Sequence, residues 1–210
     1  MNDTTPGTDT TLPPQLLRDD DPAALEALHR RLADDAHDAG VLDVAYRTLD
    51  TAVGPLLLAA TDVGLVRVAF GVQDHDQVLD DLARRISPRV LRAPQRLDRV
   101  AREIDEYLAG DRRDFDLPLD LRLTSGFRRV VVEHLPLIGY GRTESYTQVA
   151  TAAGNPKAVR AAGTACALNP LPIVVPCHRV VRSDGTFGNY AGGTEAKRTL
   201  LHLEAGALRI

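Results

Sequence analysis

The chain has 210 residues, of which 44% are hydrophobic, enough for one large or two small globular domains with a buried core. No apolar run approaches the roughly 20 residues that cross a bilayer, and the N-terminus lacks the cationic and apolar stretches of a secretion signal. We therefore expect a cytoplasmic protein with no membrane partner. With only two cysteines, Cys166 and Cys177, neither a disulfide framework nor a cysteine-rich zinc site can form.

The net charge of −4 is unevenly distributed along the chain. Residues 122–210 hold 11 Lys+Arg against 5 Asp+Glu, a net of +6, whereas residues 1–121 hold 14 against 24, a net of −10. This asymmetry is expected when one domain contacts phosphates and the other does not. Random variation in surface charge is the alternative explanation.

An N-terminal extension is predicted over residues 1–43. Its first 20 residues are rich in Thr, Pro and Asp and are expected to be disordered. Asp21 and Pro22 then supply a cap and a first-turn proline for a helix that ends near Gly40. One face of this helix carries Leu25, Leu28 and Leu32. We expect this face to pack on the body of the protein, and a partner helix is the alternative.

Residues 44–120 are predicted to form a small α/β domain. From Val44 to Phe70, β-prone runs alternate with turn signals at residues 53–55 and 61–64, which indicates a meander or hairpin. Apolar residues at helical spacing before Gly110 then predict an amphipathic helix: Leu97, Val100, Ala101, Ile104, Tyr107 and Leu108. Nothing in this domain is predicted to be catalytic. Its scattered histidines and those of the extension (His29, His37 and His75) are expected at the surface.

Residues 121–210 are predicted to be mainly helices and loops. Ser125 is a candidate cap for a helix with one apolar side, formed by Phe127, Val130, Val131 and Leu135. Ser145 and Gln148 have capping-box spacing and start a short helix through Ala153. Residues 154–156, Gly-Asn-Pro, predict that a second helix begins at once and runs to about Leu168. Two short helices so closely joined indicate a helix-turn-helix.

The sequence around Cys177 is the best candidate for chemistry. The segment Ile173–Val175 is predicted to be a short buried strand that Cys177 follows, with Pro176 before it and His178 and Arg179 after it. A fixed, locally cationic setting favours the thiolate, which is the nucleophilic form. A lone cysteine is otherwise a buried apolar filler.

His178 is the candidate base for this thiol. If residues 177 and 178 are extended, their side chains point to opposite faces, so a direct hydrogen bond is difficult and a bridging water is the natural solution. The base then needs an orienting acceptor, and Glu204, near the end of a helix predicted from Thr194 to Ala205, is the best candidate. A solvated helix residue is the alternative for Glu204.

The stretch SYTQVATAAGNPKAVRAAGTACALNPLPIVVPCHRVV resembles the signature of the methylated-DNA–protein-cysteine methyltransferases, the O6-alkylguanine-DNA alkyltransferases. The resemblance continues to Glu204 and covers most of residues 122–208. It implies an α/β protein in which a small ribonuclease-H-like domain of sheet and helices is followed by a mainly helical C-terminal domain, residues 121–210, containing the helix-turn-helix. The implied activity is a single transfer of an alkyl group from O6-alkylguanine, and less efficiently O4-alkylthymine, in double-stranded DNA.

The resemblance also implies roles for individual residues. Cys177 is the alkyl acceptor, and His178, a water and Glu204 remove its proton. Tyr146 donates a proton to the departing guanine, which is a poor leaving group while it is negatively charged. Asn169 braces the turn before the active site. From the residues alone, Tyr146 is equally compatible with a core aromatic and Asn169 with an ordinary turn residue.

Arg160, on the second helix of the helix-turn-helix, corresponds by resemblance to the arginine that enters the base stack. It fills the space left when the damaged nucleotide rotates out of the duplex. A slim helix allows close approach to the DNA, and the candidate DNA-binding residues beside Arg160 are Lys157, Ala158, Ala161 and Gly163. An ordinary surface arginine is the alternative for Arg160.

The loop over the flipped base is expected to include Tyr190, with Val180 also at the base pocket. Some relatives have serine after this tyrosine, where the chain has Ala191, so the preference among adducts is left open. Family members that bind zinc use cysteines and histidines in the N-terminal domain, and the chain has no cysteine there. We expect no metal and no cofactor, DNA with alkylated bases as the partner, and a monomer in the absence of DNA.

Three other functions were compared with alkyl transfer. A non-catalytic protein that binds or senses alkylated bases would not need Cys177. A helix-turn-helix regulator that senses alkylation would need more regulatory sequence than the extension offers. A thiol hydrolase using Cys177 and His178 would need direct contact between neighbours in an extended segment, and it would turn over repeatedly.

Overall fold

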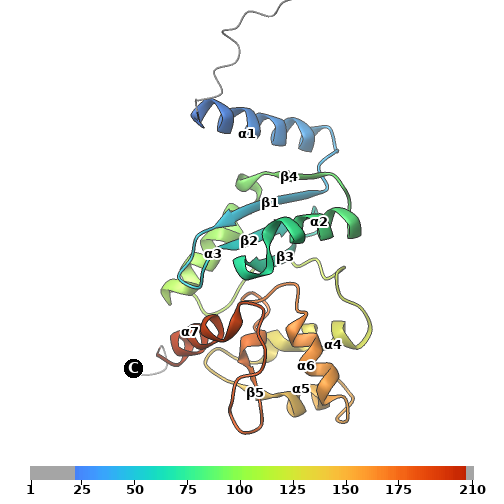
Figure 1. Cartoon of the computed structure of the whole chain (residues 1–210), viewed down its shortest axis with the longest axis vertical. Helices are drawn as coiled ribbons and strands as arrows, with labels where there is room; N and C mark the ends of the chain where they lie inside the picture. Colours follow the sequence, from blue (N-terminus) through green and yellow to red (C-terminus); the bar gives the residue numbers. More distant parts are fainter. Residues whose placement is uncertain (1–21, 207–210) are drawn as a thin grey trace, which may run out of the picture.

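The computed structural model describes residues 22–206, which stack as a helix, a sheet flanked by helices, and a second group of helices (Figure 1). The helices are α1 Pro22–Asp38, α2 His75–Arg85, α3 Asp98–Ala109, α4 Gly126–His134, α5 Tyr146–Ala152, α6 Val159–Ala167 and α7 Gly193–Gly206. The strands are β1 Val44–Leu49, β2 Leu56–Ala60, β3 Leu65–Phe70, β4 Val90–Arg92, β5 Glu144–Ser145 and β6 Val180–Val181. Short 3-10 helices are η2 Gly71–Gln73, η3 Pro94–Leu97, η4 Leu135–Leu137 and η5 Cys177–Arg179. No helix among residues 22–206 is both long and apolar enough to span a membrane.

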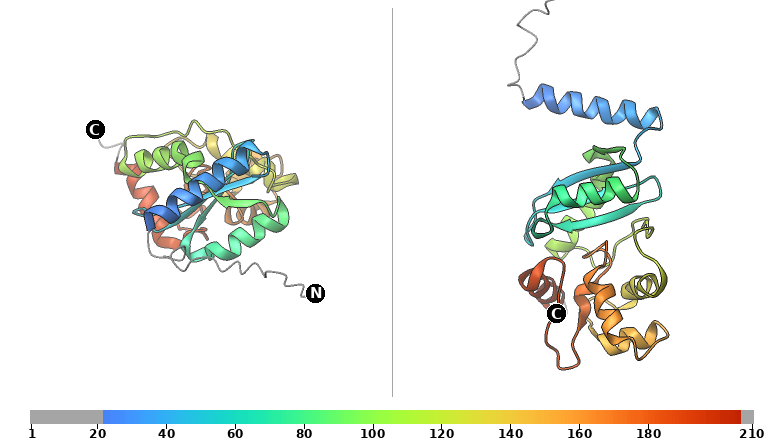
Figure 2. Two further views of the ribbon diagram at one scale, coloured as in Figure 1. Left: turned by 90° about the horizontal axis from the view of Figure 1, so that it is seen from above. Right: turned by 45° about the vertical axis from the view of Figure 1, so that its right-hand side comes forward.

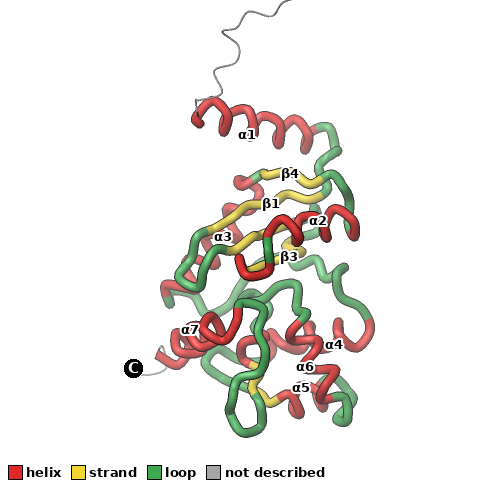
Figure 3. Tube along the Cα trace, in the orientation of Figure 1, coloured by secondary structure: helices red, strands yellow, loops and turns green. Residues whose placement is uncertain are grey.

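The four-stranded sheet has the order β3-β2-β1-β4 (Figure 3). Strands β1, β2 and β3 form the expected antiparallel meander, and β4 returns through α2 to pair parallel with β1. Alternating side chains of β2 face opposite sides of the sheet, as a strand requires. Leu56 and Leu58 join the core shared with α3 and the C-terminal helices, whereas Leu57 and Ala59 join the core under α2.

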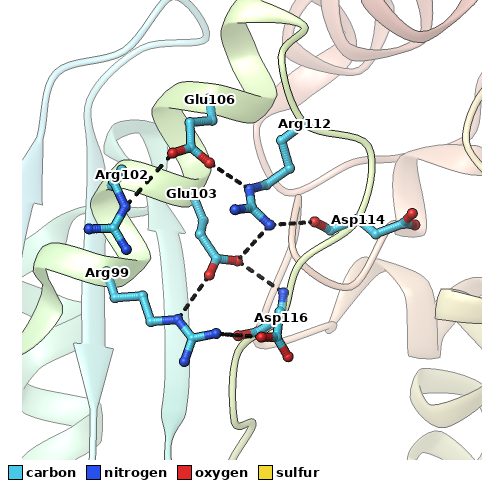
Figure 4. Close-up of polar contacts among 7 residues, drawn as sticks. All are labelled: Arg99, Arg102, Glu103, Glu106, Arg112, Asp114 and Asp116. Carbon is cyan, nitrogen blue, oxygen red and sulfur yellow. Dashed lines mark hydrogen bonds and ion pairs between the residues drawn. The ribbon is translucent and has the colours of Figure 1, made fainter.

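Helix α3 confirms the predicted amphipathic helix. Val100, Ala101, Ile104 and Tyr107 are buried, and Gly110 ends the helix with a φ of 86°, a left-handed conformation that favours glycine. A polar network then ties the connection between the two halves of the chain to α3 (Figure 4). At its centre Glu103, 2% exposed, accepts from Arg99 at 3.0 Å and from the backbone N–H of Asp116 at 3.0 Å.

The extension helix begins at Pro22 and is followed by Gly40 with a φ of 65°, as expected, but its leucine face is not buried. Leu25, Leu28 and Leu32 are 52%, 64% and 54% exposed, so the expectation that they pack on the body is wrong. Helix α1 lies beyond β4, on the side away from the C-terminal helices, and contacts the body through smaller residues such as Ala33 (Figure 2). The segment expected to be disordered lies outside the described residues.

Helix α4 forms where predicted, with two corrections. Ser125 occupies the N-cap position, but its side chain makes no capping hydrogen bond. Val130 is 45% exposed, whereas Val131, Val132 and Leu135 are buried. The buried face is therefore rotated from the predicted one, because α4 packs against α5 and α6.

The helix-turn-helix consists of α5 and α6. The capping box at Ser145 and Gln148 is present, with the Ser145 hydroxyl accepting from the Gln148 backbone N–H at 3.2 Å. The second helix does not begin at once, because Asn155–Ala158 forms a turn closed by the Ala158 N–H on the Asn155 carbonyl at 2.9 Å. Helix α6 starts at Val159 and is shorter than expected.

The strand predicted at Ile173–Val175 is wrong. These residues are buried turns, and Ile173 has a φ of 74°, outside the range of a strand. Prolines at positions 170, 172 and 176 have no N–H to donate to a strand ladder, and the Asn169 side chain binds the turn instead. The final helix, α7, confirms the predicted helix and extends one residue further at each end.

Candidate active site

Cys177 begins η5 and is 2% exposed. Burial raises the pKa of its thiol to about 11, although a hydrogen bond with the Asn169 side chain and the charge of Lys197 oppose the rise. The charge of Lys197 does favour the thiolate, but burial outweighs it, so the expected thiolate is not the resting form of the protein without DNA. In this state Cys177 is a neutral thiol that requires a base.

His178 is fully buried beside Cys177. Its Nε2 lies 2.8 Å from Glu204 Oε1, so we assign the ring proton to Nε2, because a carboxylate can only accept. Burial lowers the pKa of His178 and keeps the ring neutral. Nδ1 then presents its lone pair, and it has no hydrogen-bond partner among the described residues.

Cys177 and His178 make no direct hydrogen bond with each other in the described structure, as predicted, but the reason differs. The two residues lie in a 3-10 turn, where successive side chains point about 120° apart instead of to opposite faces. A base on Nδ1 can therefore reach the thiol proton through an intervening hydroxyl or water.

Glu204 of α7 is fully buried and holds the far side of His178. Its carboxylate also accepts from Arg179 Nε at 3.0 and 3.1 Å and from the Gly141 backbone N–H at 2.9 Å. Burial alone raises the pKa of Glu204, but the hydrogen bonds from His178, Arg179 and Tyr107 lower it to about 2. Glu204 is ionised at neutral pH, and the solvated alternative does not hold.

Tyr107 reaches this cluster from α3, which is in the half of the chain predicted to have no catalytic residue. Its hydroxyl donates to Glu204 Oε1 at 2.5 Å and lies 3.2 Å from His178 Nε2. Burial raises the pKa of Tyr107 far above its usual value, so its proton stays in place. Sequence periodicity indicated only that Tyr107 is buried, because its partners are distant in the chain.

Asn169 lies at the base of the turn that leads to Cys177 and is 3% exposed. Its Nδ2 donates to the Val175 carbonyl at 2.8 Å, and its Oδ1 accepts from the Leu171 backbone N–H at 3.0 Å. These two side-chain hydrogen bonds brace the turn before Cys177, although the turn itself replaces the strand that the sequence predicted.

Tyr146 opens α5 and is half-buried. Burial raises the pKa of its hydroxyl to about 12, with smaller contributions from Cys166 and Cys177. A Cβ on Gly188 would overlap the Tyr146 hydroxyl and lie 2.9 Å from its Cζ, so any larger residue there would displace the Tyr146 side chain or the loop. Tyr146 is thus a neutral donor held against the loop that follows Cys177.

The same loop carries Tyr190, whose ring packs edge-on against Phe70 at 5.5 Å and against His178 at 6.2 Å between centroids. Val180 is buried in β6, and its carbonyl accepts a short hydrogen bond from Lys197 Nζ. Sequence analysis assigned no role to Lys197, which is fully buried.

The candidate DNA-binding residues lie on and just before α6. Lys157, Arg160 and Ala161 are exposed, whereas Ala158 and Gly163 are half-buried. Exposure of both cations leaves them available to phosphates or bases. Within residues 22–206, no three potential metal-binding side chains come together.

Comparison with known proteins identifies the family. Residues 126–206 match the family described as 6-O-methylguanine DNA methyltransferase, DNA binding domain, and residues 44–121 match its ribonuclease-like domain. The methylated-DNA–protein-cysteine methyltransferase of Mycolicibacterium paratuberculosis is 38% identical over 161 residues, covering 77% of the chain and 92% of that protein. The chain belongs to the methylated-DNA–protein-cysteine methyltransferase family.

Other family members match over similar lengths. The constitutive methylated-DNA–protein-cysteine methyltransferase of Bacillus subtilis is 37% identical over 76% of the chain and 94% of that protein. The bifunctional transcriptional activator/DNA repair enzyme Ada of Escherichia coli is 39% identical over 80% of the chain, which spans only 48% of Ada.

The fold of the family is also confirmed by solved structures. The O6-methylguanine methyltransferase of Mycobacterium tuberculosis superposes with a TM-score of 0.69 at 35% identity, covering 78% of the chain and 94% of that protein. The M. tuberculosis OGT in complex with DNA superposes equally well, at 36% identity. The predicted α/β domain followed by a helical domain with a helix-turn-helix is therefore correct.

Proposed function

We propose that this methyltransferase repairs double-stranded DNA by moving an alkyl group from O6-alkylguanine, and less efficiently from O4-alkylthymine, to Cys177 Sγ. The observation that carries the assignment is the buried cluster of Cys177, His178 and Glu204 in a chain of this family. A thioether does not release its alkyl group, so each molecule acts once. Neither a cofactor nor a metal is needed, because the damaged DNA is the alkyl donor.

His178 supplies the base for the first step. At pH 7, ionising a thiol with a pKa of about 11 costs about 5 kcal/mol. His178 Nδ1 accepts the thiol proton through a water, and the carboxylate of Glu204 stabilises the imidazolium that forms. The Tyr107 hydroxyl keeps that carboxylate in position. Proton removal and attack on carbon are thus coupled.

Tyr146 completes the reaction. Sγ forms its bond to the alkyl carbon as the carbon–oxygen bond breaks, and the bonding electrons leave with guanine. The Tyr146 hydroxyl gives its proton to the guanine ring, so the base departs neutral, and the imidazolium of His178 returns a proton to Tyr146. Asn169 holds the turn that aims Sγ at the alkyl carbon.

The damaged base must leave the duplex to reach Cys177, and α6 assists this step. Arg160 fills the stack where the nucleotide rotates out, which offsets a few kcal/mol of unstacking. The small residues Ala158, Ala161 and Gly163 allow the close approach of α6, and Lys157 contacts a phosphate. Such docking fits the minor groove.

The base pocket closes around the extruded nucleotide. Cys177 is only 2% exposed, so the loop carrying Tyr190 has to shift before the base can enter. Tyr190 and Val180 then flank the base, and Ala191 offers no hydroxyl to its oxygen. We place the protein in the cytoplasm, as a monomer until it meets DNA.

Stoichiometry tests the proposal. Known amounts of protein are mixed with duplex carrying O6-methylguanine, repaired lesions are counted, and the intact protein is weighed. We expect each chain to gain one methylene mass, the gain to disappear in Cys177→Ser, and Cys166→Ser, which removes the other buried thiol, to keep it. Repeated turnover would indicate a hydrolase instead. Binding without a mass change would indicate a protein that only senses lesions.

A further inference from the structure

A groove lies where the sheet meets the C-terminal helices, away from the base pocket. Its main cavity, about 210 Å³, is lined from one side by β3, η2 and α2 and from the other by α4 and the end of α6. A second cavity of about 170 Å³ shares Arg67, Gln73, Asp81 and Leu123 with the first, so the two form one groove.

Three arginines and one aspartate line this groove. Arg85 is already paired, with Asp81 at 3.2 Å, and it also donates to the Leu123 carbonyl at 3.3 Å. Arg67 and Arg128 are both half-buried, and neither forms an ion pair within the described part of the chain. The Nε of Arg67 is buried and has no hydrogen-bond partner there. With three arginines and one aspartate, the lining of the groove carries a net charge of +2, and Asp81 is shared between its ion pair with Arg85 and an electrostatic attraction to Arg67.

We propose that this groove is a phosphate-binding site. The planar forks of Arg67 and Arg128 suit the oxygens of a phosphate, and such pairs are strongest where solvent is partly excluded. The amide of Gln73 adds a further donor in the same cavity. Arg67 and Arg85 belong to the first 121 residues, which carry a net charge of −10. Arginines gathered at one place in such an acidic segment therefore do not reflect a generally basic surface.

The DNA backbone is the source of phosphate that the geometry favours. Helix α6 carries Arg160 near its beginning and leads to Leu168, which lines the groove. Eight residues of helix span about 12 Å, which is the separation of Arg160 and Leu168 along α6. We infer that a duplex docked on Arg160 brings a backbone phosphate to the groove. Free phosphate or pyrophosphate is the other source with the same chemistry.

The floor of the groove is continuous with the active-site turn. Asn169 and Pro170 line the cavity, and the Pro170 carbonyl accepts from the Val68 backbone N–H of β3 at 2.8 Å. Asn169 also holds the Val175 carbonyl, two residues before Cys177. A phosphate bound here would therefore contact the segment that positions the nucleophile.

The salt dependence of DNA binding tests whether the groove binds a phosphate of the DNA backbone. This part of the proposal rests on the proposed function. Affinity for undamaged duplex is measured by fluorescence anisotropy across a salt series. The slope of log K against log salt is negative. We expect its magnitude to decrease by about 1 in Arg128→Gln and by about 2 in the double variant with Arg67→Gln. Arg129→Gln is the matched control, because Arg129 is the next residue on α4 and is paired with Glu133 at 2.8 Å. Its slope should stay at the wild-type value.

The second arm titrates inorganic pyrophosphate into the protein without DNA and follows binding by calorimetry. Saturable binding that Arg128→Gln abolishes, with an unchanged DNA slope, would assign the groove to free phosphates. If neither the slope nor pyrophosphate binding depends on Arg128, the proposal is wrong. Arg128 is a half-buried residue on helix α4, so we expect Arg128→Gln to fold. This variant decides the result even if Arg67→Gln fails to fold.

Both arms use undamaged DNA or no DNA, so they do not depend on alkyl transfer. Transfer itself is measured separately, as the mass gained by the wild-type protein from a free O6-alkylguanine base, which carries no phosphate. A wild-type protein that gains no mass from either this base or damaged duplex would contradict the proposed function while leaving the groove intact.

Discussion

Replacement of Glu204 by glutamine perturbs both the stability and the chemistry of the protein. The carboxylate accepts from four different groups: His178, Tyr107, Arg179 and the backbone of Gly141. An amide of the same size has only one oxygen, so its NH₂ group must face a donor. The substitution also leaves Arg179, which is 4% exposed, without a counter-charge.

The loss of stability expected for Glu204→Gln follows from the burial of Arg179. Removing one partner of a buried ion pair destabilises a protein by about 3–5 kcal/mol, since the remaining charge is buried and unpaired. In a chain of this length that lowers the Tm by about 6–20 °C. Alkyl transfer should slow by about 100-fold or more, because the imidazolium of His178 loses its stabilising charge.

Urea unfolding and a single-turnover transfer assay measure the two effects separately. Tyr107→Phe removes only one donor to the carboxylate and should lose about 1.5–3 kcal/mol, with a smaller loss of rate. Glu195→Gln is the matched control on the same helix, because its ion pair with Arg198 is exposed, and it should change stability by less than about 0.5 kcal/mol. A Glu204→Gln protein within about 1 kcal/mol of wild type would refute the buried carboxylate as the anchor of this cluster.

Three further predictions concern Gly188, Cys177 and His178. Gly188→Ala should slow transfer by about tenfold or more, because its Cβ displaces the Tyr146 hydroxyl, whereas Gly139→Ala, which meets no atom closer than 3.9 Å, should not. Iodoacetamide should modify Cys177 slowly in the native protein, and the rate, followed by mass spectrometry, should rise about tenfold per pH unit between pH 7 and 9; a plateau in that range would contradict the raised pKa. The pKa of His178 is lowered on folding, so the unfolded chain takes up a proton near pH 6.5 that the folded protein does not. The free energy of unfolding should therefore decrease as the pH falls below 6.5, and that decrease should be smaller in His178→Asn.

Local structure could be predicted from the sequence wherever a short motif determines it. The capping box of Ser145 and Gln148 and the glycine stop at Gly110 depend on residues within one helical turn of each other. Their predictions were confirmed because no distant contact competes with those hydrogen bonds.

The prediction failed where distant or unusual contacts override a hydrophobic pattern. Ile173–Val175 is typical of a buried strand, but three prolines and the Asn169 side chain impose a turn, and the apolar side chains are buried all the same. Helix α6 starts at Val159 because the backbone after Gly154 first closes a separate turn.

The sequence predicted the candidate nucleophile and the candidate base, but not the residues that hold them in place. Cys177 and His178 are adjacent, and their chemistry is apparent from residue type. Tyr107 and Arg179 acquire their roles only because α3 and η5 converge on the same carboxylate of α7. No periodicity in one segment reports a contact with another that lies 97 residues away.

Burial shifts the pKa values of the proton donor and the proton acceptor in opposite directions. It raises the pKa of the Cys177 thiol and lowers the pKa of His178, so transfer of the proton between them is unfavourable in the protein alone. A bound alkylated base changes this balance, because the thiolate is consumed as it forms and the proton is taken up by the leaving guanine. A protein that acts once benefits from this arrangement, since a thiol that ionised freely would also react with other electrophiles and oxidants. The low reactivity expected for Cys177 without DNA and the proposed alkyl transfer from damaged DNA are thus two results of the same buried cluster.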